Sequence, residues 1–140
     1  MAVADMANNI KELFPDYVVL IKIGTFYECY NMDANILAYL FKYKIKTLAS
    51  NDKVSGFPGV SYNKVISNLE KRSINYISID KKHNYEEIDK VNYKKKNKYK
   101  EVIDRANKYI DIITRVDRIR NILLKNNSKI SDVERLLYER

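Results

Sequence analysis

Apolar residues along the first 80 positions recur in patterns that alternate between helix and strand. The segment at residues 17–23, which is apolar except for Lys22, predicts a strand that is buried on both faces. Apolar residues three or four positions apart from Asp33 onward predict a helix. A short helix capped by Asn8 or Asn9 is expected to end before Pro15. The remaining elements are a helix at 62–72, strands at 43–48, 54–60 and 74–79, and a strand-like or irregular segment at 26–30. The pattern predicts an α/β (α+β) fold, with a small mixed sheet and flanking helices.

Beyond residue 80 the pattern becomes polar and then purely helical. Residues 81–97 are rich in lysine and almost free of aliphatic side chains, which predicts a basic linker or a short solvated hairpin. Over residues 98–126, apolar side chains recur alternately three and four positions apart, as in a long amphipathic helix. A break then precedes a short final helix capped by Ser131. The predicted organisation is a folded module at 1–80, the linker, and a helical C-terminal tail at 98–140.

The chain is strongly basic. Its formal net charge is +8, from 26 Lys and Arg against 18 Asp and Glu. Such a charge favours a polyanionic partner such as nucleic acid. The joint abundance of Lys, Asn, Ile and Tyr is also expected of an AT-rich genome, so the charge alone leaves both explanations open.

Several functional classes are disfavoured by what the sequence lacks. Cys29 is the only cysteine and His83 the only histidine, so neither an internal disulfide nor a cysteine-based zinc site is expected. The three glycines form no phosphate-binding loop, and the carboxylates are not grouped at metal-ligand spacing. No apolar run approaches the ~20 residues that cross a bilayer, and residues 1–9 do not resemble a signal peptide. We therefore expect a soluble, cytoplasmic protein without enzymatic activity, bound nucleotide, metal or cofactor.

One short segment has chemistry suited to nucleic acid. Phe26, Tyr27 and Glu28 directly follow Gly24 and Thr25. In an extended backbone, Phe26 and Glu28 point to one face of the strand and Tyr27 to the other. An exposed ring can enter a base step, and a carboxylate two residues on can test the hydrogen-bonding edge of a displaced base. Taken alone, the tripeptide is more typical of an ordinary strand in which Phe26 is core and Glu28 is solvated.

Two segments, in order and at matching spacing, resemble the MutS mismatch-recognition domain (domain I). The first runs without gaps from Phe14 to Thr47 and includes Phe14-Pro15-Asp16, Gly24-Thr25-Phe26-Tyr27-Glu28 and Asp33-Ala34. The second is Pro58-Gly59-Val60-Ser61-Tyr62-Asn63-Lys64-Val65. The likeness covers residues 10–80. The sequence departs from the family pattern at Thr25, Ser61 and Asn63, where the family has Asp, Pro and His.

The resemblance implies that Phe26 is a wedging aromatic residue and Glu28 a base-probing carboxylate. We expect a stand-alone module, without the clamp and ATPase domains of MutS proteins, that binds mismatched, bulged or otherwise kinkable duplex DNA in mismatch repair. Phosphate contacts are expected from four lysines, Lys22, Lys44, Lys46 and Lys53. The alternative is an interaction or assembly module that has lost mismatch reading. It would act through the amphipathic helix at residues 98–126, with a second copy or another protein as partner.

Overall fold

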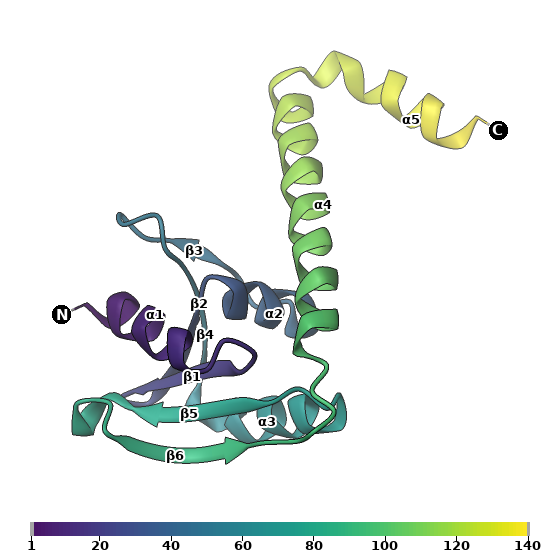
Figure 1. Ribbon diagram of the computed structural model, residues 1–140. Coiled ribbons are helices and arrows are strands. Elements are labelled where there is room, and N and C mark those ends of the chain that lie inside the picture. Colours follow the sequence, from purple (N-terminus) through teal and green to yellow (C-terminus); the bar gives the residue numbers. More distant parts are fainter. Residues whose placement is uncertain (1, 140) are drawn as a thin grey trace. The chain divides into compact units, whose positions relative to one another are not determined.

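The structure is a computed structural model that describes residues 2–139, without the side chains of His83 and Glu87 (Figure 1). The chain forms two compact units, residues 1–107 and residues 108–140. Unit 1 contains α1 (Val3–Leu13), β1 (Val18–Ile23), β2 (Phe26–Tyr30), α2 (Met32–Phe41), β3 (Lys46–Thr47), β4 (Lys53–Pro58), η1 (Gly59–Ser61), α3 (Tyr62–Lys71), β5 (Tyr76–Asp80), η2 (Lys81–His83), β6 (Glu87–Asn92) and the first turns of α4 (Tyr99–Lys125). Unit 2 contains the rest of α4, η3 (Asn127–Lys129) and α5 (Ile130–Tyr138). None of the helices within residues 2–139 is both long enough and apolar enough to cross a membrane.

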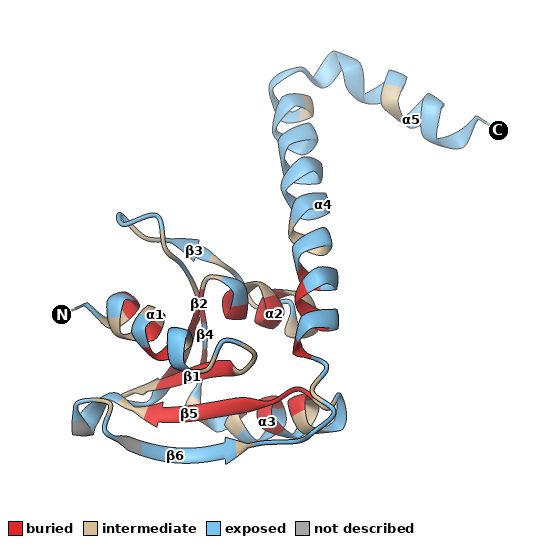
Figure 2. Cartoon of the chain, in the orientation of Figure 1, coloured by how far each residue is buried: buried red, intermediate tan, exposed pale blue. Residues whose placement is uncertain are grey.

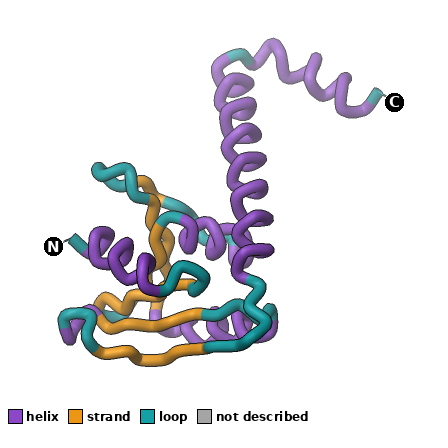
Figure 3. Tube along the Cα trace, in the orientation of Figure 1, coloured by secondary structure: helices purple, strands orange, loops and turns teal. Residues whose placement is uncertain are grey.

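Unit 1 is built on one six-stranded sheet in the order β3-β4-β2-β1-β5-β6 (Figure 3). The central strands β1 and β5 are parallel, with Val18 opposite Tyr76 and Lys22 opposite Asp80. All other neighbouring strands are antiparallel. The predicted mixed sheet with flanking helices is therefore confirmed, as is the helical C-terminal tail.

Apolar residues of β1 and β5 fill both faces of the sheet, and Figure 2 shows these two strands as its buried centre. The expected burial of β1 on both faces holds for residues 18–21. Alternate residues of the strands join two different hydrophobic clusters. One cluster combines the sheet with α2, α3 and the start of α4, and includes Leu20, Leu37, Leu69, Tyr76 and Tyr99. The other combines the sheet with α1, and includes Ala4, Ala7, Ile10, Val19 and Ile77.

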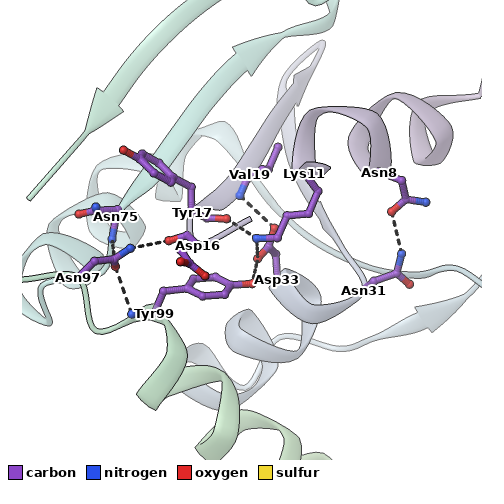
Figure 4. Close-up of polar contacts among 10 residues, drawn as sticks. All are labelled: Asn8, Lys11, Asp16, Tyr17, Val19, Asn31, Asp33, Asn75, Asn97 and Tyr99. Carbon is purple, nitrogen blue, oxygen red and sulfur yellow. Dashed lines mark hydrogen bonds and ion pairs between the residues drawn. The ribbon is translucent and has the colours of Figure 1, made fainter. Parts of the chain in front are cut away.

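A buried carboxylate ties four elements of unit 1 together (Figure 4). Asp33, in the first turn of α2, pairs with Nζ of Lys11 from α1 at 2.8 Å. Its oxygens also accept hydrogen bonds from the Tyr99 hydroxyl of α4 at 2.7 Å and from the Val19 amide of β1 at 3.1 Å. Burial raises the pKa of Asp33, whereas Lys11 and the two other donors act in the opposite direction. Each donor thus stabilises a charge that burial alone would disfavour.

The compact unit continues well past residue 80. Within residues 81–97, where a basic linker or hairpin was expected, β6 pairs with β5 along the edge of the sheet. The buried side chain of Asn75 then holds the chain after β6. Its Nδ2 donates to the Lys94 carbonyl at 3.2 Å, and its Oδ1 accepts from the Lys94 amide at 2.9 Å. The predicted boundary at residue 80 therefore lies inside unit 1, which extends to residue 107.

The expected start of the first helix was wrong. α1 begins at Val3, directly after Ala2, so neither Asn8 nor Asn9 caps it. The buried side of this helix consists of two small residues and one larger one: Ala4, Ala7 and Ile10. Alanines contribute little to an apolar periodicity, so the first two turns of α1 have only a weak signal in the sequence.

Two other element boundaries also differ from expectation. Ser131 is not a cap, because α5 begins at Ile130 and follows η3 without a break. The strand expected at residues 43–48 is reduced to Lys46–Thr47. The side chain of Tyr43 instead packs against the hydrophobic cluster that includes α2 and α3.

We expect Tyr99→Phe to lower the free energy of unfolding by about 1–3 kcal/mol, because Asp33 loses one donor while the ring packing is kept. Tyr93→Phe removes a hydroxyl from an exposed tyrosine and should leave the free energy of unfolding unchanged. Urea denaturation followed by circular dichroism measures both variants. Wild-type stability of Tyr99→Phe would show that Asp33 does not depend on this donor.

Candidate nucleic-acid interface

The turn between β1 and β2 holds Phe26 at one end of the sheet. Gly24 and Thr25 form a two-residue connection between Ile23 and Phe26, which are opposite each other in the ladder. Gly24 has a φ of +60°, which glycine adopts without strain and which suits the first central position of a type II′ hairpin turn. Phe26 is 53% exposed. The tight turn therefore presents an aromatic side chain to solvent at the start of β2.

A second loop brings two more apolar side chains beside Phe26. Pro58, the last residue of β4, is opposite Phe26 in the ladder. The next residue, Gly59, donates its amide to the Thr25 carbonyl at 2.7 Å, and a Cβ on Gly59 would lie 3.0 Å from that oxygen. Val60 is 94% exposed. Phe26, Pro58 and Val60, which we call the apolar tip, line a shallow pocket of about 550 Å³.

Glu28 shares a face of β2 with Phe26 but lies farther along the strand, and it is half-buried. Its Oε2 accepts a hydrogen bond from the Tyr30 hydroxyl, and burial together with this bond raises the pKa of Tyr30. Gly56 of β4 is opposite Glu28. A Cβ on Gly56 would lie 2.7 Å from the Tyr27 carbonyl oxygen and 3.3 Å from Cγ of Glu28. Glycine at this position therefore leaves the space that the Glu28 side chain occupies.

Five aromatic rings form a stacked row behind the apolar tip. Tyr27 stacks on Tyr62 with ring centroids 4.4 Å apart, and on Phe57 at 5.5 Å. The row continues from Phe57 to Tyr43 at 5.8 Å, and from Tyr43 to Phe41 at 5.5 Å. Tyr27 and Phe57 adjoin the apolar tip in sequence, and both are buried. The stacked row thus fixes the backbone of the two strand ends that carry the tip.

Three lysines lie at the same end of the sheet as the apolar tip. Lys22 is opposite Asp80 in the parallel pair β1–β5, and Lys81 and Lys82 follow β5 directly. With Gly24 they line a pocket of about 620 Å³, and we call Lys22, Lys81 and Lys82 the lysine cluster. Asp80 accepts a hydrogen bond from the Lys82 amide at 2.8 Å, which fixes the start of η2. Of these lysines only Lys22 was expected from the sequence, because local sequence pattern does not show that β1 and β5 end at the same end of the sheet.

The other three lysines suggested by the sequence lie at the opposite end of the sheet. Lys53 starts β4, five residues before Pro58, or about 17 Å away along the strand. Lys46 belongs to β3, which pairs with the beginning of β4, and Lys44 precedes β3. All three side chains are exposed. The structure therefore brings Lys22 to the apolar tip and separates the other three from it.

Side-chain amides fix the loop between β3 and β4 at this far end (Figure 4 includes one of the bonds). Asn31 donates to Oδ1 of Asp52 at 3.0 Å and to Oδ1 of Asn8 at 3.1 Å, and it accepts from the Lys53 amide at 3.0 Å. Hydrogen bonds from Asn31, Ser50 and Asn8 lower the pKa of Asp52. Asn8 therefore anchors a loop rather than capping a helix.

The arrangement has the chemistry of a binding surface. It combines an apolar tip, a half-buried carboxylate and a cluster of ammonium groups. Across the described part of the chain, no three His, Cys, Asp or Glu residues come together in a way that could hold a metal ion. The lone Cys29 is buried, and burial raises the pKa of its thiol.

Comparison with known proteins gives one family. A family model described as MutS domain I matches residues 5–106, well over half of the chain. The match spans all six strands and the first turns of α4, whereas the resemblance seen in the sequence covered residues 10–80. A search of the curated proteins gave no match.

The exposure of Phe26 can be checked by stability. We expect Phe26→Ala to change the free energy of unfolding by less than about 1 kcal/mol, because half of the ring is already in solvent. Phe57→Ala removes a ring that is 1% exposed, and it should lower the free energy of unfolding by about 3–5 kcal/mol. Urea denaturation of both variants measures the difference. A loss of several kcal/mol for Phe26→Ala would mean that this ring is part of the core.

Proposed function

We propose, because the chain belongs to the MutS domain I family, that its unit 1 binds duplex DNA at base steps that are easily kinked. A mismatch or a bulge provides such a step. The family is that of the mismatch-recognition domain, so membership gives the chain a role connected with DNA mismatches and their repair. The observation that supports the finer proposal is the exposure of Phe26 beside Pro58 and Val60, at the turn between β1 and β2.

The apolar tip would select its target by the cost of opening the duplex. Entry of Phe26 into a base step requires the bases to unstack, which costs a few kcal/mol. The cost is lowest where pairing is already damaged. Stacking on the ring supplies about 1–3 kcal/mol in return, so the balance favours a damaged step over a paired one.

Glu28 would act as a probe of the displaced base. The Tyr30 hydroxyl bonds to one carboxylate oxygen and thereby restricts the orientation of the group. The carboxylate can then accept a hydrogen bond from a base N–H, and its protonated form can donate to a purine nitrogen. Its place two residues behind Phe26 on the same face puts it next to the step that the ring would open.

The lysine cluster would hold the DNA backbone beside the apolar tip. Contacts to phosphate fix the position of a protein on a duplex and carry no sequence information directly. Lys22, Lys81 and Lys82 supply them at the end of the sheet where Phe26 lies. Stacking, hydrogen bonding and phosphate attraction all contribute to the free energy of binding. We therefore propose that the chain binds DNA and does not catalyse a reaction on it.

We expect Phe26→Ala to reduce the preference for a mismatched over a fully paired duplex by about 5- to 150-fold, which corresponds to the 1–3 kcal/mol of stacking. Weak binding to the paired duplex should persist, because phosphate contacts are the same on both. Tyr93→Ala removes an exposed aromatic ring outside the apolar tip and should keep the preference. Fluorescence anisotropy with duplexes of equal length measures it. An unchanged preference in Phe26→Ala would contradict the wedge.

The lysine cluster can be tested through the salt dependence of binding. Each lysine–phosphate contact contributes about 0.9 to the slope of log K against log salt. The double variant Lys81→Ala/Lys82→Ala should therefore reduce the slope by about 1.8. Lys95→Ala/Lys96→Ala removes the same charge beyond the other end of β6, and should leave the slope unchanged. Equal slopes for the two double variants would contradict the assignment.

A further inference from the structure

Unit 2 consists of amphipathic helices whose apolar side chains are not buried. No described residue from 108 to 139 is buried, although α4 and α5 carry regular apolar residues. The largest exposed apolar side chains of this part of α4 are Ile112, Ile113, Val116, Ile119, Ile122 and Leu124. In proteins most of the stability of a helix comes from packing of its apolar face against another element. An exposed apolar helix face of this kind is typical of a helix that packs against another helix.

The spacing of these residues is that of a coiled coil. Taking position 109 as a of a heptad, apolar residues occupy every a and d position through position 123: Tyr109, Ile112, Val116, Ile119 and Leu123. The separations are three, four, three and four residues. The pattern therefore predicts pairing with another helix along a seam formed by the a and d positions, with Ile113 at e and Ile122 at g widening the apolar face.

The residues flanking the seam identify the partner and its direction. The e positions are Ile113 and Arg120, and the g positions are Arg115 and Ile122. In a parallel pair of identical helices, g of one chain faces the following e of the other. Arg115, which also pairs with Asp111 of its own helix at 3.7 Å, would then face Arg120, and the two guanidinium groups would repel. In an antiparallel pair e faces e and g faces g. Ile113 then faces Arg120, and Ile122 faces Arg115.

We propose that residues 109–123 of α4 pair with the same segment of a second copy in an antiparallel coiled coil. Val116 of one chain lies opposite Ile119 of the other, and Ile112 lies opposite Leu123. The aliphatic stems of the arginines extend over the neighbouring isoleucines while their guanidinium groups stay in water. The helix is thus complementary to its own reversed copy. This inference does not depend on the proposed function of unit 1, although two linked copies would gain avidity on one duplex.

The mass of the full chain in solution tests the pairing. Sedimentation equilibrium at tens of micromolar should give twice the chain mass of 16.5 kDa. Ile119→Glu introduces a charge into the seam and should halve the observed mass. Asn121→Glu places the same charge on the outer side of the helix, at an exposed f position, and should leave the dimer intact. A monomeric wild-type chain, or an Ile119→Glu variant that remains a dimer, would overturn the proposal.

Disulfide trapping tests the direction. Positions 112 and 123 are 11 residues apart, or about 16 Å along a helix. In the antiparallel pair, an Ile112→Cys chain mixed with a Leu123→Cys chain should cross-link under mild oxidation, and neither variant should cross-link alone. In a parallel pair each variant would cross-link alone, which would overturn the proposal. The wild-type chain is the control, because its one thiol, Cys29, is buried.

Discussion

The fold of unit 1 depends on the carboxylate of Asp33. It lies fully inside the protein, where an uncompensated charge costs several kcal/mol, and it is held by donors from three other elements. Lys11 brings α1 onto one side of the sheet, and Tyr99 brings the first turn of α4 onto α2. The ammonium of Lys11 also lies 4.2 Å from the centroid of the Tyr99 ring. Segments almost 90 residues apart in sequence therefore meet at one buried charge.

Local contacts at the end of the sheet hold the backbone around an apolar side chain that remains in solvent. Phe26 would gain free energy by burial, but the short Gly24–Thr25 turn and the bond from Gly59 leave its strand end little freedom. The stacked rings behind it hold the same strand ends from the opposite face. An exposed ring on a fixed backbone loses little entropy when it stacks on a base, which is the property that a wedge requires.

The sequence predicted the parts of this structure that depend on local pattern. The buried strand at residues 17–23, the helix near Asp33 and the long helix from residue 98 each follow from a clear periodicity. Placement in space was less predictable. The sequence suggested phosphate contacts from Lys44, Lys46 and Lys53, but strand order puts these lysines at the far end of the sheet. Lys81 and Lys82 lie near Lys22 only because β1 and β5 are parallel neighbours. The end of the folded unit was also missed, because Tyr99 and Asn75 act through long-range hydrogen bonds that leave no local signal.

The most direct test of the account is to map where a mismatched duplex contacts the protein. Backbone amide signals of the ¹⁵N-labelled chain would be followed by NMR during titration with a mismatched duplex and with a paired duplex of the same length. If the apolar tip enters the duplex, the signals of Gly24 to Phe26, and of Gly59 and Val60, should shift with the mismatched duplex and much less with the paired one. Shifts confined to β3, to Lys53 or to α4, or equal shifts with both duplexes, would contradict it.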